Sequence, residues 1–199
     1  AGITCDEVND PRPWCEIIRK WSTFHPEFSF LPRKFKIAIT GCKNDRAAIE
    51  LHDIGLRLVK RKKLIGFQIF VGGGQGRTPV IGKEIREFLP TKYILSYLES
   101  ILRIYNELGR RDNIYKARIK ILVNEIGILK FKKLVEKEWE FIKETCFLSK
   151  TEISNAKKFF ENPPLIDNFS TPPKNDNYEY NQWLRFNVLK HKISGYSIV

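Results

Sequence analysis

The fold is decided by the stretch IGLRLVKRKKLIGFQIFVGGGQGRTP, residues 54–79. Apolar residues alternate with other residues on both sides of the basic run Lys60-Arg61-Lys62-Lys63, and this period of two is typical of β-strands. The basic run between them has the composition of a turn. We therefore predict strands near residues 54–60 and 64–71, the second of which leads directly into a glycine-rich loop at Gly72.

The same alternation occurs upstream, where residues 34–40 place Phe35, Ile37 and Ile39 on one face and Lys34 and Lys36 on the other. This pattern predicts a further strand at residues 34–40. Apolar side chains at helical spacing predict helices at residues 14–23, 94–108, 119–126 and 131–142. The predicted fold class is α+β, with a mixed β-sheet flanked by helices.

Composition restricts the class of protein. The chain has 199 residues, of which 42% are hydrophobic and 13% aromatic, so it can bury a core and is not a disordered basic tail. Lys and Arg number 35 against 23 Asp and Glu, a net charge of +12 that favours anionic ligands. No apolar run approaches the ~20 residues of a membrane span, and no signal peptide is visible. We expect a cytoplasmic protein without a membrane partner.

The four cysteines (Cys5, Cys15, Cys42 and Cys146) stand far apart, without a C-x-x-C pair, and the three histidines do not cluster near them. A self-contained zinc or iron–sulfur site is therefore not expected, and no metal ligand is predicted in this chain. The low cysteine density predicts buried, reduced thiols.

Proline and asparagine gather near the C-terminus and predict a linker at residues 161–177. It would separate a domain at residues 1–160 from residues 178–199, which are too few to form a domain alone. The chain contains no methionine, begins at Ala1 and ends on an apolar run, so we expect a partial sequence.

Two segments could bind anions. Lys34 and Lys36, on one strand face, would lie roughly 7 Å apart and repel each other unless an anion sits between them; a solvated strand face is the alternative. Gly72-Gly73-Gly74 permits close backbone approach to a polyanion or a flat cofactor. The loop matches neither common nucleotide-binding motif, and a structural turn remains the alternative.

A third basic segment begins at Arg110-Arg111 and continues to Lys116, Arg118 and Lys120. Arginines at a helix–loop junction can bind carboxylates or phosphates through two N–H groups. On a regular helix Arg118 and Lys120 would point to opposite sides, because each residue turns by ~100°. Both reach one ligand only if the helix starts later or the ligand is large, and a solvated basic face is the alternative.

Five motifs follow one another in a specific order: DPRPWC (10–15), LPRKFK (31–36), DIGL (53–56), VGGGQGRTP (71–79), and RRDN (110–113) through Ala117-Arg118. This succession resembles the sulfite and nitrite reductase hemoproteins, enzymes built on siroheme coupled to a 4Fe-4S cluster. Residues 178–199 resemble the opening of the second ferredoxin-like half-domain of that family. The resemblance thus implies a siroheme-binding α+β domain followed by the beginning of a ferredoxin-like half-domain.

The resemblance also implies function: six-electron reduction of sulfite to sulfide or of nitrite to ammonia, with electrons from ferredoxin or an NADPH-dependent flavoprotein. Lys34 and Lys36 match the family's catalytic lysines, which hold the oxyanion and supply positive charge and protons. The carboxylates of siroheme imply basic and glycine contacts, for which the candidates are Arg33, Gly72, Gly73, Gly74, Arg77, Arg111, Arg118 and Lys120. None of the four cysteines matches the cluster ligands, so those ligands and the upstream arginines of the pocket are expected elsewhere. This chain alone is expected to be inactive.

Two other functions fit parts of the sequence. The net charge and the run Lys60 to Lys63 would suit a basic α/β nucleic-acid-binding protein, although no aromatic RNA-binding fingerprint is present. The glycine loop would suit a phosphate- or nucleotide-binding domain. We favour the reductase, without a nucleic-acid partner. The sequence leaves the preference between sulfite and nitrite, the electron donor and the oligomeric state open.

Overall fold

The computed structural model describes residues 1–161 and 176–199. The predicted linker, residues 161–177, therefore lies almost entirely outside the described residues. The helices are α1 (Arg12–Ser22), α2 (Ile94–Leu108), α3 (Ile119–Ile126), α4 (Ile128–Ile142), α5 (Lys150–Lys158) and α6 (Tyr178–Asn187). The strands are β1 (Ile37–Thr40), β2 (Ile54–Arg61), β3 (Leu64–Val71), β4 (Lys83–Pro90), β5 (Leu189–Lys190) and β6 (Ser197–Ile198).

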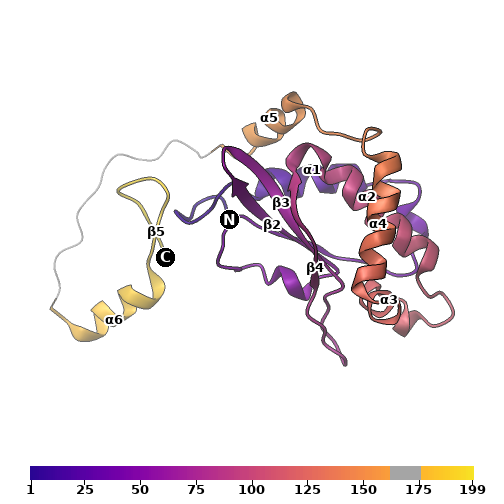
Figure 1. The fold of residues 1–199 in the computed structure, drawn as a ribbon. Helices are drawn as coiled ribbons and strands as arrows, with labels where there is room; N and C mark the ends of the chain where they lie inside the picture. Colours follow the sequence, from indigo (N-terminus) through magenta and orange to yellow (C-terminus); the bar gives the residue numbers. More distant parts are fainter. Residues whose placement is uncertain (162–175) are drawn as a thin grey trace.

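Strands β1 to β4 form one mixed sheet in the order β1-β2-β3-β4 (Figure 1). β1 runs parallel to β2, whereas the pairs β2–β3 and β3–β4 are antiparallel. Lys62, with φ of 53°, lies in the tight turn of the β2–β3 hairpin, where the basic run was predicted to turn the chain. The predicted α+β class with a mixed sheet flanked by helices is confirmed.

Two features of the sheet differ from the prediction. β1 begins at Ile37, so Lys34 and Lys36 lie in an irregular segment before the strand. β4 was not predicted, because its two buried residues, Ile85 and Leu89, both with 0% exposure, are four residues apart and the charged residues around them give no alternating pattern. Irregular pairing with β3 also turns Arg86 toward the helices, where it lies over the Trp139 ring.

The helices cover the face of the sheet formed by the alternate apolar residues of β2 and β3. Ile54, Leu56 and Leu58 from β2 are buried there together with Phe67 and Ile69 from β3. Trp14 of α1 packs edge-on against Phe67, with ring centroids 5.2 Å apart. Burying such side chains stabilises the fold by about 1.5–3 kcal/mol each, so this layer holds the sheet in place.

The predicted helices are found with small changes at their ends. α2 and α3 coincide with the predicted ranges and end at Gly109 and Gly127, while α1 and α4 begin earlier than predicted. α5 was not predicted. A capping box, in which Ser149 and Glu152 bond to each other's backbone N–H groups, begins it.

The C-terminal residues form α6 and the short β5–β6 hairpin, and none of the α6 residues is buried. Lys192 donates its backbone N–H to the Ile3 carbonyl at 2.8 Å, which joins this hairpin to the N-terminal residues. Among the described helices, none is both long and apolar enough to cross a membrane.

All four cysteines are free thiols. Cys5 and Cys15 are exposed and Cys146 is partly exposed, so the prediction of buried thiols is correct only for Cys42. Cys15 lies on the outer side of α1, because the buried face of this helix is formed by Trp14, Ile17 and Ile18.

Candidate functional site

Asp53, the residue immediately before β2, joins two of the predicted basic segments. Its carboxylate is fully buried and accepts hydrogen bonds from Nε and Nη2 of Arg118, at 2.9 and 2.7 Å. The backbone N–H of Lys36 donates to Oδ2 of the same carboxylate at 2.8 Å. Burial raises the pKa of Asp53, and the bonds from Arg118 and Lys36 oppose this increase. The segment carrying the lysines is thus tied to the start of α3 by a charge-assisted bridge.

The side chains of Lys34 and Lys36 are exposed, whereas the backbone around them is anchored. The Lys36 carbonyl accepts from the Ile54 N–H at 3.1 Å, and the Arg33 carbonyl lies 3.2 Å from the buried Tyr105 hydroxyl. That hydroxyl also lies 2.8 Å from the Ala117 carbonyl, and burial, with Asp53 nearby, raises the pKa of Tyr105 to about 12.

Arg33 reaches across to the segment after α2, where its Nη1 donates to the Ile114 carbonyl at 2.6 Å. Arg111 makes the reverse connection, since it donates to the Phe30 carbonyl at 2.9 Å and to the Asn106 side chain at 2.6 Å. These two arginines hold the segment around the lysines against the end of α2. Arg33 and Lys34 also line a cavity of about 400 Å³ together with aromatic and aliphatic side chains.

Gly72, Gly73 and Gly74 are buried, and each is packed against the protein itself. A Cβ on Gly73 would lie 2.2 Å from the Glu50 carbonyl oxygen, and one on Gly72 would lie 3.2 Å from Val123. Gly72, with φ of +86°, also donates its N–H to the Asp53 carbonyl at 2.9 Å. The absence of side chains here lets the loop approach Asp53 and β2 closely.

Lys120 closes the loop that follows these glycines. Lys120 is only 6% exposed, and its Nζ donates to the carbonyls of Gln75 and Thr78, at 3.1 and 2.6 Å. Gly74 and Val80 exchange backbone hydrogen bonds of 2.9 and 2.8 Å at the base of the same loop. Arg77 is exposed at its tip.

Arg118 and Lys120 reach the same place, although helical geometry alone would direct them apart. α3 begins at Ile119, and Arg118 precedes it in an extended conformation with φ −70° and ψ 150°. A Cβ on Gly74 would lie 2.9 Å from the Lys120 Cδ and 3.6 Å from the Arg118 Nη2. The later helix start that the sequence analysis left open is what the structure shows.

The charges of this region are unevenly compensated. Within residues 1–161 and 176–199, no carboxylate forms an ion pair with Lys34, Lys36, Arg77 or Lys120. Arg118 is neutralised by Asp53. Lys34, Lys36 and Arg77 are thus exposed cations to which an anionic group of a ligand, such as an oxyanion or a carboxylate, could bind.

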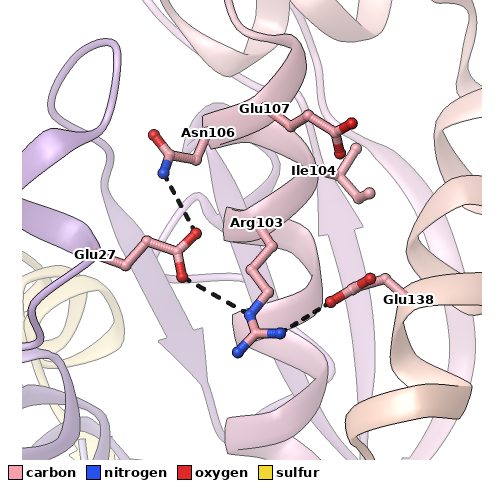
Figure 2. A pocket seen from close by; sticks show the side chains of 6 residues that line it. All are labelled: Glu27, Arg103, Ile104, Asn106, Glu107 and Glu138. Carbon is pink, nitrogen blue, oxygen red and sulfur yellow. Dashed lines mark hydrogen bonds and ion pairs between the residues drawn. The ribbon is translucent and has the colours of Figure 1, made fainter.

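A second arginine centre has the opposite balance (Figure 2). Arg103 of α2 donates to Glu138 of α4 at 3.0 Å and to Glu99 at 2.7 Å, and its Nε lies 3.7 Å from Glu27. The residues around it line a cavity of about 350 Å³: Glu27, Arg103, Ile104, Asn106, Glu107 and Glu138. Carboxylates outnumber the single cation, so this cavity repels anions.

Sequence reasoning gave Asp53 and Tyr105 no role in the site. Asp53 is part of the motif DIGL, and the available signal was a carboxylate placed directly before a strand of buried residues. Tyr105 belongs to the apolar stripe of α2, which predicts a core position, and its hydroxyl contacts could not be read from that spacing.

Comparison with known proteins supports the same region. A family model described as "Nitrite and sulphite reductase 4Fe-4S domain" matches residues 1–143. Sulfite reductase [ferredoxin] 1 of Mycolicibacterium paratuberculosis is 33% identical over 140 residues, which cover 70% of this chain and 25% of the relative. The sulfite reductase [NADPH] hemoprotein beta-component of Staphylococcus epidermidis is 36% identical over 107 residues, covering 50% and 18%.

The solved structure of the Mycobacterium tuberculosis NirA protein matches with a TM-score of 0.63 and 30% identity, over 70% of this chain and 25% of that one. The chain thus spans a quarter or less of the length of these proteins. The match of residues 1–143 covers the sheet, α1 to α4 and every residue of the candidate site. The chain belongs to the nitrite and sulphite reductase 4Fe-4S domain family.

Proposed function

We propose that this chain is part of a siroheme- and 4Fe-4S-dependent reductase that converts sulfite to sulfide or nitrite to ammonia. The single observation that carries the proposal is the state of Lys34 and Lys36: their side chains are open and without a carboxylate partner among the described residues, while the backbone of Lys36 is fixed to a buried carboxylate. A fixed pair of cations is the arrangement that stabilises charge on a bound oxyanion. Family membership supports the same function.

In this proposal Lys34 and Lys36 bind the substrate oxyanion and donate protons to its oxygen atoms as these leave. Ammonium groups suit both tasks, because each carries three donors and a full positive charge. Their fixed backbone reduces the reorganisation needed when negative charge develops. The distinction between sulfite and nitrite rests on other parts of the pocket, since the lysine pair serves either anion.

We propose that residues of the same region would hold siroheme, which would supply redox-active iron for the reduction. Arg77 at the loop tip is open to bind its carboxylates. Arg33, Arg111, Arg118 and Lys120 have partners within the protein, but each retains N–H donors that these partners do not occupy. Gly72, Gly73 and Gly74 are buried against the protein, so in this proposal they shape the loop that presents Arg77 to the ring, and Lys120 would keep that loop in place.

The complete activity needs groups that these residues do not supply. The four cysteines are free and dispersed, so we propose that the ligands of the 4Fe-4S cluster come from other parts of the protein and that the 199-residue chain alone has no turnover. The relatives named for ferredoxin and for NADPH support either ferredoxin or an NADPH-dependent flavoprotein as electron donor.

The test is the visible absorption spectrum of the protein expressed from its complete coding sequence in cells that make siroheme. We expect siroheme bands and consumption of sulfite or nitrite with a chemical reductant. A folded protein that binds no siroheme contradicts the proposal. Salt-dependent binding to duplex DNA by that siroheme-free protein would instead support the nucleic-acid-binding alternative.

A further inference from the structure

We propose that Asp53 is the positioning residue of the lysine pair: through the Lys36 amide it sets where Lys34 and Lys36 stand, and Arg118 holds it in place. The inference rests on the proposed function, since it concerns the residues proposed to bind the oxyanion. It adds a residue that neither the lysines nor the glycine loop would identify.

The backbone of residues 33–36 has few hydrogen bonds to the other residues that the structure describes. This segment precedes β1, so the ladder between β1 and β2 does not hold it. Among the described residues, its backbone makes hydrogen bonds only at its two ends, with Tyr105 at Arg33 and with Asp53 and Ile54 at Lys36. Within the described chain the Lys36 N–H has only the Asp53 carboxylate as acceptor, so Asp53 anchors the end of the segment that carries Lys36, while Tyr105 holds the peptide that precedes Lys34.

The side chain of Asp53 is itself held rigidly. The Asp53 carboxylate is fully buried and receives three N–H donors, two of them from one guanidinium. A carboxylate held on both oxygens cannot rotate without breaking a charge-assisted bond. Its own backbone is fixed as well, because its carbonyl accepts from Gly72 at 2.9 Å. Asp53 is thus hydrogen-bonded to both the lysine segment and the glycine loop and fixes the position of each.

The negative charge of Asp53 is offset by Arg118. An isolated buried carboxylate near Lys34 and Lys36 would weaken the positive potential that an oxyanion needs. Arg118 compensates Asp53 at short distance, so the pair adds little net charge and the lysines keep theirs. Asp53 therefore provides position without reducing the attraction for the anion.

The experiment begins with amide hydrogen exchange of the protein expressed from its complete coding sequence and of its Asp53→Ala variant. We expect exchange of the Lys36 amide to become at least about tenfold faster, because this N–H loses its charged acceptor. Asp53→Asn keeps one amide oxygen as acceptor and should give a smaller increase. Unchanged exchange at residues 33–36 in both variants overturns the inference.

Glu136→Gln is the matched control. Glu136 also pairs with an arginine, Arg86, and accepts a further hydrogen bond from Tyr97 at 2.8 Å. It lies on α4, however, and its two partners belong to β4 and α2. This variant should leave exchange at residues 33–36 unchanged. An equal acceleration in it would show general loosening and would overturn the inference. If Asp53→Ala does not fold, Asp53→Asn takes its place: its amide oxygen is a weaker, uncharged acceptor, so the Lys36 amide should still exchange faster than in the wild type.

The second measurement uses the protein expressed from its complete coding sequence, with sulfite as probe and the siroheme absorption as signal. We expect Asp53→Asn to raise the Kd for sulfite about tenfold while the ratio of siroheme to protein stays at the wild-type value. Wild-type affinity in Asp53→Asn rejects the inference alone. Absence of siroheme from the wild-type protein rejects the proposed function instead, so the two failures are distinguishable.

Discussion

Arg118 and Arg103 are both held by carboxylates, yet they organise two different parts of the molecule. Arg118 shares one carboxylate, that of the fully buried Asp53, with the lysine segment. Arg103 is itself 38% exposed and lies between the partly exposed carboxylates of Glu27 and Glu138 (Figure 2), and it also pairs with the nearly buried Glu99. At the Arg118 centre the one carboxylate pairs with the arginine, and the lysines keep their positive charge uncompensated. At the Arg103 centre three carboxylates surround one arginine, so the net charge is negative.

The two centres differ in burial and in charge balance, and these properties determine where an anion can bind and which ion pair contributes most to the free energy of unfolding. Breaking a buried charge pair is costly because the remaining charge cannot be solvated, while a partly exposed pair is replaced by water and salt. Changes at the Asp53 centre should therefore affect both folding and anion binding. Changes at the Arg103 centre should affect neither strongly. The following predictions test this contrast.

The largest loss of stability is expected for Asp53→Ala. It leaves the Arg118 guanidinium without its carboxylate and the Lys36 N–H without an acceptor, so the free energy of unfolding should fall by about 3 kcal/mol. Urea denaturation measures this. Asp53→Asn should cost less, because burial raises the pKa of Asp53 and so already disfavours its charged form. Equal losses in the two variants would contradict this explanation.

Next is Gly73→Ala, which tests whether the glycine loop must pack tightly beside Asp53. The new Cβ would lie 2.2 and 2.5 Å from the carbonyl oxygens of Glu50 and His52, so the backbone must shift at a cost of about 2 kcal/mol. Gly74→Ala is the control, because its Cβ meets the flexible Lys120 side chain and should cost clearly less. A thermal melt of both variants decides, and equal melting temperatures would refute the packing argument.

Lys120→Met should have an intermediate effect. The variant keeps much of the buried aliphatic chain but removes the hydrogen bonds to the Gln75 and Thr78 carbonyls, so we expect a loss of about 1–2 kcal/mol. Limited proteolysis by trypsin should also cleave sooner after Arg77, which the loosened loop carries. Unchanged cleavage at Arg77 would show that Lys120 does not hold the loop.

The smallest effect is expected for Arg103→Gln at the contrasting centre. Glu27, Glu138 and Arg103 itself are partly exposed and only Glu99 is buried, so the free energy of unfolding should fall by only about 1 kcal/mol. Sulfite binding by the complete protein should remain as in the wild type. A loss as large as that of Asp53→Ala would show that the two arginine centres do not differ in the way burial suggests.

Much of this organisation could be predicted from the sequence, because it depends on local patterns. The period of two in residues 54–71 and the apolar stripes of α2 and α3 mark the main elements correctly. β4 was missed because Lys83, Glu84 and Glu87 dominate its sequence, and its irregular pairing with β3 breaks the period of two between Ile85 and Leu89. β4 can be identified from its pairing with β3 but not from its own sequence pattern.

The candidate site was predictable in its residues but not in its connections. The lysines, the glycines and Arg118 are visible as motifs, whereas the bridge from Lys36 through Asp53 to Arg118 joins residues far apart in the chain. Two local errors follow from the same cause. The strand was expected to include Lys34, and the direction of Arg118 was judged by a helix that begins one residue later.

The most direct test of the central claim is the affinity for sulfite of the protein expressed from its complete coding sequence, compared with its Lys34→Ala/Lys36→Ala double variant. Both side chains are exposed, so the substitutions should change the free energy of unfolding by less than about 0.5 kcal/mol. We predict unchanged siroheme content and at least a roughly hundredfold higher Kd for sulfite in the variant. Wild-type affinity in the siroheme-loaded double variant would contradict the account.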